Sequence, residues 1–196
     1  MPPAPEFTVA GDVDPELAGH DYFVVCGTIE PRKNHLLLLN IWRELAHELG
    51  AATPKLVLVG ARGWDNENVV DMLERCDGVR RHVIESGRLS SPALRNLLMG
   101  ARALLMPSFA EGYGLPVVEA LAVGAPVIAS DIESFRSVRR AGLTLVDATD
   151  GPAWAAQIKA ALTSDKCSAT GQKTGTAHIL NWTLHLSHVE SFVRQL

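Results

Sequence analysis

The sequence has no surplus of basic charge and few cysteines. Its 18 lysines and arginines are outnumbered by 22 aspartates and glutamates, so we expect no nucleic-acid partner, because proteins that bind one usually carry a basic patch. The three cysteines, Cys26, Cys76 and Cys167, show no metal-ligand spacing and are odd in number. This pattern indicates free thiols in a reducing compartment and excludes a disulfide-stapled domain.

Long apolar runs and a leader are also missing. No uncharged apolar stretch approaches the ~18 residues that a membrane-spanning helix needs. The first residues, Met-Pro-Pro-Ala-Pro-Glu, have neither the basic segment nor the apolar segment of a signal peptide. We therefore expect a soluble, cytoplasmic protein. With 47% hydrophobic and 20% charged residues, the chain can bury a full core.

Composition along the 196 residues predicts one domain with an arm at each end. Residues 1–20 carry four prolines and are interpreted as an arm or linker. Residues 21–165 are predicted to be a Rossmann-like domain, and residues 166–196 a connector followed by a C-terminal helix from residue 183. That last helix either docks on this domain or packs on another one.

Apolar, β-rich runs alternate with amphipathic stretches in the central part. Strands are expected at residues 22–26, 55–59, 79–85, 103–106, 126–129 and 143–146. Helices are expected at residues 34–50, 69–77, 91–100, 115–123, 132–139 and 152–162. Asn34 and Ser91 are the predicted caps of two of them, with Pro92 at the first helical position. The alternation predicts an α/β fold, a doubly wound parallel sheet with helices on both faces, whose ligands bind beyond the carboxyl ends of the strands.

Residues 107–119 combine a strand end, a glycine loop and a helix start. Gly112 and Gly114 lie in the loop, and a proline follows in the first helical turn, where its missing N–H is harmless. The bare N–H groups of that helix make an anion site. Two carboxylates eight residues apart extend this site. Glu111 can reach a group attached on the far side of a bound phosphate, and Glu119 can accept hydrogen bonds from the two hydroxyls of a ribose.

The full pattern F-x-E-G-x-G-L-P-x-x-E-A-x-A-x-G-x-P-V, which begins at Phe109, resembles the donor-site signature of retaining GT-B glycosyltransferases of the mannosyltransferase and glycogen-synthase type. The resemblance implies that the chain is one half of a GT-B fold. By the same resemblance the donor site includes Glu111, Gly112, Tyr113, Gly114, Leu115 and Glu119.

The resemblance also implies what these residues do. Glu111 would contact hydroxyls of the donor sugar, Glu119 the ribose, and the amides of Gly114 and Leu115 the phosphate. Gly112 would lie near the sugar. Tyr113 is interpreted equally as a second sugar neighbour and as a loop aromatic that packs on the core.

The loop Gly27-Thr28-Ile-Glu-Pro-Arg32-Lys33 places two cations directly after the first strand. Such cations would grip a diphosphate through charge-assisted hydrogen bonds of about 1.5–3 kcal/mol each, and would stabilise the charge that develops when the sugar leaves. A solvated helix start is the alternative. The resembling family has an arginine where this chain has Thr28, so Arg32 is the candidate replacement, while Lys33 matches the family's lysine.

A third loop follows the third predicted strand. Gly87, Arg88 and Leu89 stand where the resembling family lines the nucleobase pocket, and a plain turn is the alternative. Residues 60–63 follow the second strand in a comparable place.

The resemblance implies retaining transfer of a hexose, with Glu111, Lys33 and Arg32 as catalytic residues. The departing phosphate would help to deprotonate the acceptor on the same face. The Thr-Ile-Glu-Pro-Arg-Lys-Asn variant resembles the branch that builds bacterial surface polysaccharides such as lipopolysaccharide, which favours mannose from GDP-mannose, with UDP-linked sugars as the alternative. A glycan or lipid-linked acceptor is expected. The seven histidines show no metal-ligand spacing, so no metal and no cofactor are expected.

Only the donor half of such an enzyme is covered. We expect the N-terminal acceptor domain to be missing, by excision or in a naturally shortened gene, and the chain alone to bind donor but transfer little. The full-length protein could then sit peripherally at the inner face of the membrane. Two other classes stay open: half of a sugar-nucleotide epimerase, and a non-catalytic nucleotide-sugar-binding module.

Overall fold

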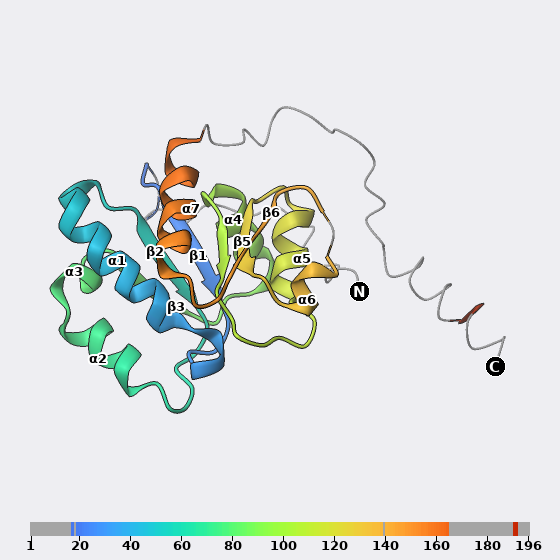
Figure 1. Cartoon of the computed structure of the whole chain (residues 1–196), viewed down its shortest axis with the longest axis horizontal. Coiled ribbons are helices and arrows are strands. Elements are labelled where there is room, and N and C mark those ends of the chain that lie inside the picture. The colour runs from blue at the N-terminus through green and yellow to red at the C-terminus, as the bar shows by residue number, and fades with distance from the viewer. Residues whose placement is uncertain (1–16, 18, 139, 165–189, 192–196) are drawn as a thin grey trace.

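The computed structural model describes residues 17, 19–138, 140–164 and 190–191, and its centre is a six-stranded parallel sheet (Figure 1). The strands lie in the order β3-β2-β1-β4-β5-β6. Their bounds are β1 Tyr22–Cys26, β2 Lys55–Val59, β3 Val83–Gly87, β4 Leu104–Met106, β5 Val127–Ser130 and β6 Leu143–Val146. This order confirms the predicted doubly wound α/β fold, because the chain builds outward from β1 in one direction and then returns to build outward from β4 in the other.

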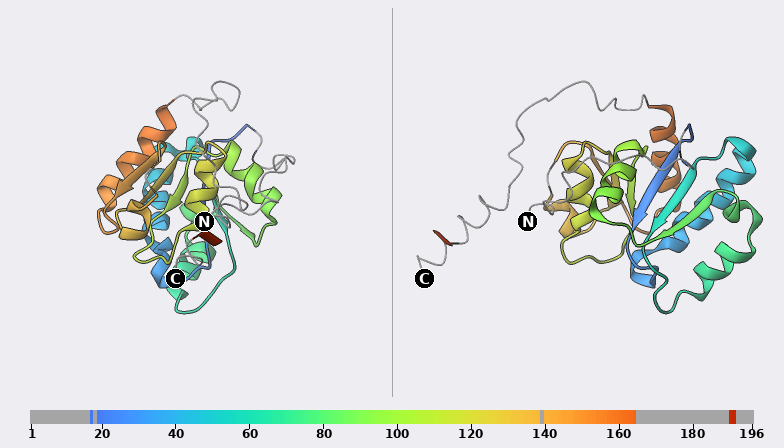
Figure 2. Two further views of the ribbon diagram at one scale, coloured as in Figure 1. Left: turned by 90° about the vertical axis from the view of Figure 1, so that its right-hand side faces the viewer. Right: turned by 180° about the vertical axis from the view of Figure 1, so that it is seen from behind.

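Helices cover both faces of the sheet (Figure 2). Their bounds are α1 His35–Leu49, α2 Glu67–Arg75, α3 Asp77–Arg80, α4 Ser91–Gly100, α5 Leu115–Ala122, α6 Glu133–Arg136 and α7 Gly151–Thr163, with short 3-10 turns η3 Pro31–Lys33 and η4 Gly50–Ala52. Side chains of α1, α2, α3 and α7 share one core cluster, and those of α4, α5 and α6 share the other. Successive side chains of β1 point to opposite faces of the sheet, so Val24 belongs to the second cluster and Val25 to the first.

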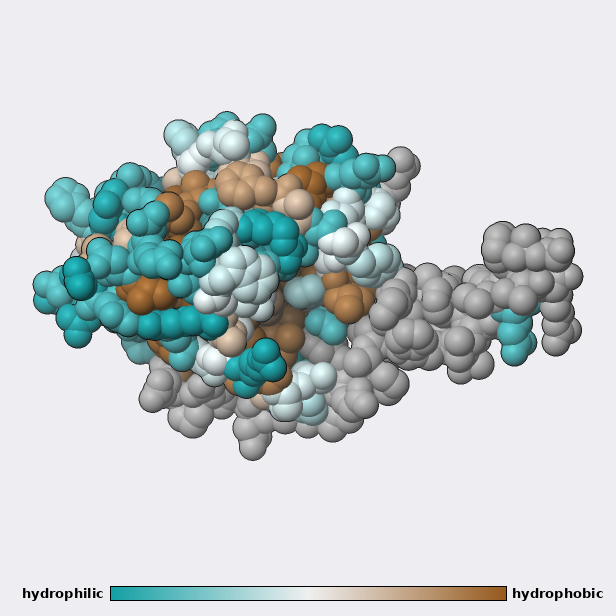
Figure 3. Space-filling model, turned by 90° about the horizontal axis from the view of Figure 1, so that it is seen from below, coloured by the Kyte–Doolittle hydropathy of each residue, from teal (hydrophilic) through white to brown (hydrophobic). Residues whose placement is uncertain are grey.

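The pairing of β1 with β4 positions the functional loops. Val24 and Val25 of β1 lie beside Leu104 and Leu105 of β4, although about eighty residues separate them in the chain. The loops that follow these two strands therefore meet at the carboxyl edge, at the point where the strand order reverses. Figure 3 looks onto this edge from below and shows hydrophilic residues over most of the face, with apolar residues between them.

The predicted third strand begins too early. Residues 77–80 form the short helix α3, and the strand starts only at Val83. Val79 is fully buried as part of that helix, and Gly78 lies so close to α1 that an added Cβ would be 3.3 Å from Cβ of Ala46. Residues 79–80 of the predicted strand therefore belong to a helix that packs on α1.

Two predicted caps also differ from the structure. Ser90, not Ser91, caps α4, and its hydroxyl accepts a hydrogen bond from the amide of Ala93 at 3.4 Å. Asn34 stands at the start of α1 but in the left-handed region, with a φ of 53°, and its side chain does not cap the helix. The predicted terminal helix falls almost entirely outside the described residues, of which only 190–191 belong to it. In the part that is described, no helix has both the length and the apolar character to cross a membrane.

Candidate functional site

The loop after β1 is shaped by a glycine and an asparagine. Gly27 has a φ of 137°, and a Cβ there would lie 2.9 Å from Cε of Lys33, so the glycine leaves room for the lysine stem. At the end of η3, the amide group of Asn34 donates hydrogen bonds to the carbonyls of Pro107 at 3.2 Å and Ala148 at 3.1 Å. Asn34 thus ties the β1 loop to the loops that follow β4 and β6.

The loop after β4 ends at Gly114, the N-cap of α5. Its φ of 77° suits glycine, and a Cβ there would lie only 2.5 Å from Cε1 of Phe135. This close approach seats the start of α5 against α6. The N–H groups of Gly114 and Leu115 have no acceptor within α5, because a helix leaves its first N–H groups unpaired.

Glu111 meets the two cations of the β1 loop directly. Its Oε1 lies 2.5 Å from Nζ of Lys33 and accepts a hydrogen bond from the hydroxyl of Ser108 at 2.7 Å, and its Oε2 lies 3.2 Å from Nη1 of Arg32. The side chains of Glu111 and Lys33 are only 8% and 12% exposed. Burial by itself raises the pKa of Glu111, but the hydrogen bonds from Lys33 and Ser108 and the charges of both cations outweigh it and hold the pKa below its ordinary value.

Arg32 is held between two acids and a carbonyl. Its Nη2 lies 2.5 Å from Oε1 of Glu30, and its Nη1 donates to the carbonyl of Ala110 at 2.7 Å as well as to Glu111. Its own carbonyl accepts a hydrogen bond from the amide of Phe109 at 2.9 Å. Glu30 is buried, with 4% of its side chain exposed, whereas Arg32 is 46% exposed.

Glu119 sits in a different environment from Glu111. It is half-buried on α5, and burial raises the pKa of its carboxyl group. Among the described residues we find no hydrogen bond or ion pair to its carboxylate. Burial also raises the pKa of the Cys26 thiol to about 12, and the charge of Glu119 adds to this effect while that of Lys33 opposes it. Both charges therefore lie near the end of β1.

The structure thus brings one group of predicted residues together and keeps another apart. Lys33, Arg32 and Glu111 touch, and Gly27 and Thr28 belong to the same loop. Gly87 is the last residue of β3, two strands away from β1, and has a φ of 66°. Arg88 and Leu89 follow it, and Arg88 is exposed.

Arg62, in the loop after β2, is held by ion pairs and does not extend freely toward residues 87–89. Its guanidinium binds Glu85 of β3 through two nitrogens, at 2.9 and 2.8 Å, and Glu74 of α2 at 2.6 Å. Its role in the described structure is to fasten the β2 loop to β3 and α2.

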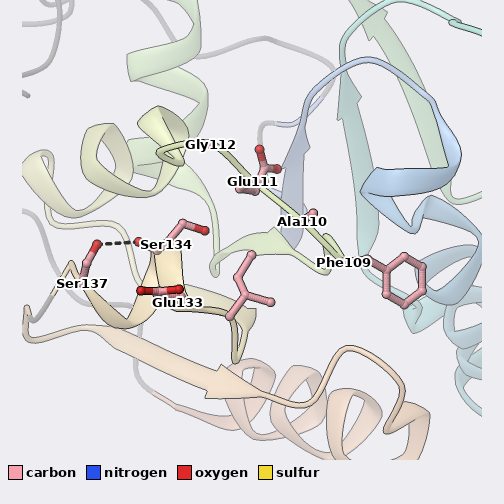
Figure 4. A pocket seen from close by; sticks show the side chains of 8 residues that line it. Phe109, Ala110, Glu111, Gly112, Glu133, Ser134 and Ser137 are labelled. Carbon is pink, nitrogen blue, oxygen red and sulfur yellow. Dashed lines mark hydrogen bonds between the residues drawn. The ribbon is translucent and has the colours of Figure 1, made fainter.

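A hollow of about 490 Å³ adjoins Glu111 on the side of α6 (Figure 4). It is lined by Phe109, Ala110, Glu111, Gly112, Ile132, Glu133, Ser134 and Ser137. In Figure 4 the carboxylate of Glu111 points away from α6 and the ring of Phe109 points away from the serines. Tyr113 is 45% exposed, which leaves it a loop aromatic at the surface rather than a core side chain.

Sequence reasoning missed two residues of this site, Glu30 and Ser108. Both lie inside the predicted loops, and Ser108 is only 1% exposed. No spacing rule marks them, because each contacts a charged residue of its own loop, Arg32 for Glu30 and Glu111 for Ser108, that in turn reaches the other loop. Among the described residues, no group of three or more His, Cys, Asp or Glu side chains is arranged to hold a metal ion.

Comparison with known proteins finds a matching protein family and several similar proteins. A family model described as "Glycosyl transferases group 1" matches residues 20–164. The chain is 34% identical over 170 residues to "O-antigen chain mannosyltransferase B" of Escherichia coli, covering 85% of this chain and 44% of that protein. It is 30% identical over 142 residues to "O-antigen chain mannosyltransferase RfbU" of Salmonella typhimurium, covering 71% of this chain and 38% of that protein. The chain therefore spans less than half the length of these relatives.

Solved structures agree on the fold. The TM-score is 0.76 with sucrose-phosphate synthase from Thermosynechococcus elongatus, at 22% identity over 91% of this chain and 46% of that one. It is 0.73 with Anabaena Alr3699/HepE in complex with UDP, at 17% identity over 91% of this chain and 50% of that one. At these identities the likeness shows the fold, which is that of one half of a GT-B protein.

Proposed function

Because the chain belongs to the group 1 glycosyltransferases, we propose that it is the donor-binding half of a retaining enzyme that transfers mannose from GDP-mannose. The acceptor is a glycan or a lipid-linked glycan of a bacterial surface polysaccharide. The names of the relatives support the sugar and the pathway, since both are O-antigen mannosyltransferases.

The observation that carries the proposal is the buried contact between Glu111 and Lys33 across the two loops. It places a cation and a carboxylate side by side at the reversal point of the sheet, next to the start of α5. Lys33 and the first amides of α5 then bind the diphosphate, while Glu111 faces the sugar and Glu119 accepts the ribose hydroxyls. The low pKa of Glu111 keeps it ionised, as a group that stabilises positive charge on the sugar requires.

The reaction breaks the bond between the sugar C1 and the diphosphate oxygen. Negative charge builds on the departing diphosphate, and Lys33 and the α5 amides stabilise it. The same phosphate oxygen accepts the proton of the acceptor hydroxyl, which attacks C1 from the face that the diphosphate leaves, so the configuration is retained. This chemistry requires no metal and no cofactor from the protein.

The acceptor side of the cleft belongs, in this proposal, to a second domain that precedes this one in the whole enzyme. The chain covers 44% of its E. coli relative and about half of the solved neighbours. The 196-residue chain is therefore expected to bind the donor without appreciable transfer.

Isothermal titration calorimetry with GDP, UDP and ADP, first in EDTA and then with magnesium, tests the proposal. We expect GDP to bind most tightly and without magnesium, and Lys33→Met to weaken it. The matched control is Lys159→Met, which removes an equally charged group from a surface pair between α7 and α1. Selectivity for UDP or ADP would move the donor to another sugar series. No binding of any nucleotide, or appreciable transfer by the chain alone, would refute the proposal.

A further inference from the structure

Arg32 makes more contacts with its own protein than an arginine that is free to bind a phosphate would make. Its Nη1 donates to the carbonyl of Ala110 and the carboxylate of Glu111, its Nη2 pairs with Glu30, and its main-chain carbonyl accepts from the amide of Phe109. Three of these four contacts fall on consecutive residues, 109–111, of the β4 loop. Arg32 therefore fastens the segment that carries Glu111.

Glu30 explains why the guanidinium lies in this orientation. Its carboxylate is almost fully buried and pairs with one end of the guanidinium, so the other end is turned toward the β4 loop. A buried carboxylate is tolerated when it is paired, and arginine offers a planar fork that can serve two partners at once. Lysine has no such fork, since all its donors sit on one nitrogen, whereas Glu30 and Ala110 are bound by two different nitrogens of Arg32.

Lys33 differs from Arg32 in both respects. Its Nζ contacts Glu111 but has no second acid comparable to Glu30 among its described partners. Its stem runs past Gly27, where a Cβ would come within 2.9 Å, so its charge lies at the very end of β1. This is the edge position at which a diphosphate on the α5 amides would meet it.

We propose that Glu30 and Arg32 are positioning residues for Glu111, and that Lys33 alone among the β1-loop side chains contacts the diphosphate. Glu30 holds Arg32, and Arg32 holds residues 109–111, so that the Glu111 carboxylate stays where the donor sugar will lie. The inference rests on the proposed function, since it divides that site into a part that binds nucleotide and a part that reads the sugar.

Hydrogen exchange of the ligand-free chain tests whether Arg32 holds residues 109–111 in place. In Arg32→Ala, in Arg32→Lys and in the isosteric Glu30→Gln, we expect the protection of the Phe109 amide to fall about tenfold, because its acceptor and its neighbours loosen. Lys159→Ala, which removes a cation as exposed as Arg32 from a surface ion pair, should leave that amide unchanged. Unchanged protection in Glu30→Gln would overturn the proposal.

Calorimetry with GDP and GDP-mannose tests the division of roles. Glu30→Gln, Arg32→Ala and Arg32→Lys should each change the Kd of GDP by less than about threefold and weaken GDP-mannose by about tenfold. The proposal is overturned if Arg32→Ala weakens both ligands equally and Arg32→Lys restores GDP, because a phosphate ligand needs only a positive charge. It is also overturned if Glu30→Gln affects neither ligand.

The two proposals can fail separately. If the unmodified chain binds no nucleotide, the proposed function is refuted, and so is the role of Glu30 and Arg32 in donor recognition. If nucleotides bind but the ratio of the two Kd values is the same in all variants, the donor site stands and the positioning role is refuted.

Discussion

Replacing Lys33 by methionine tests how far Glu111 depends on its counter-ion. The two groups lie 2.5 Å apart with side chains 12% and 8% exposed, so the change leaves a largely buried carboxylate without its closest cation. Removing one partner of a buried pair destabilises a protein by about 3–5 kcal/mol. Because Ser108 and Arg32 still contact Glu111, we expect about 2–3 kcal/mol, which for a chain of this length lowers the Tm by about 4–12 °C.

The pH dependence of this loss has a definite sign. The pKa of Glu111 lies below its ordinary 4.5 in the folded chain, so its pairing adds stability above that pH and the contribution is lost as the pH falls through the folded value. A protonated Glu111 needs no counter-ion. The difference in Tm between Lys33→Met and the unmodified chain should therefore narrow between pH 7 and pH 4.

Thermal unfolding followed by circular dichroism measures both effects. The control is Lys159→Met, since Lys159 pairs with Glu48 at 2.6 Å but both side chains are about half exposed. Such surface pairs contribute about 0–1 kcal/mol, so this variant should lose much less. Equal losses in the two variants, or a loss in Lys33→Met that is the same at both pH values, would refute the reasoning.

Three further substitutions concern neighbouring residues. Gly114→Ala puts a Cβ 2.5 Å from Phe135 at a φ of 77°, so we expect the urea-unfolding free energy to fall by about 2 kcal/mol or more, and an unchanged midpoint would contradict this. Glu119→Gln removes a charge that burial disfavours, so the Tm should rise at pH 7 but not below the ordinary pKa of the acid. The same variant should weaken GDP about tenfold and 2′,3′-dideoxy-GDP hardly at all. Ser108→Ala removes a 2.7 Å hydrogen bond, so an NMR titration should show a higher pKa for Glu111, and no shift would argue against that bond.

Much of the fold could be predicted because its signals are local. The apolar runs of β1 and β2 and the glycine that follows each of them are visible in the sequence. The start of β3 was not visible, because residues 77–80 form a short helix that packs on α1, and a tertiary contact of this kind is not marked in the local sequence. The cap of α4 was misplaced by one residue, since Ser90 and Ser91 are equivalent by type and only the chain geometry selects the first.

The site was predictable in outline and not in its contacts. Parallel strands bring their carboxyl ends to one edge, so the proximity of the β1 and β4 loops followed from the fold class. Which cation meets which acid depends on side-chain directions across two loops that no spacing rule reports. The hydrogen bonds of Asn34 are of this kind, because they join segments that are adjacent only after the sheet has formed, whereas Glu30 and Ser108 contact Arg32 and Glu111 of their own loops.

The two glutamates of the motif show how the same residue type takes on separate tasks. Both are partly removed from water, yet the pKa of Glu111 is lowered by cations and a hydroxyl, while that of Glu119 is raised by burial. Glu111 has its partners before any ligand arrives, which suits a fixed negative charge beside a sugar that becomes positive. Glu119 gains most from a ligand that supplies two hydroxyl donors, because these replace the water that burial has removed. Substituting Glu119 should therefore act chiefly on the affinity for the nucleotide, and substituting Glu111 on the sugar and its transfer.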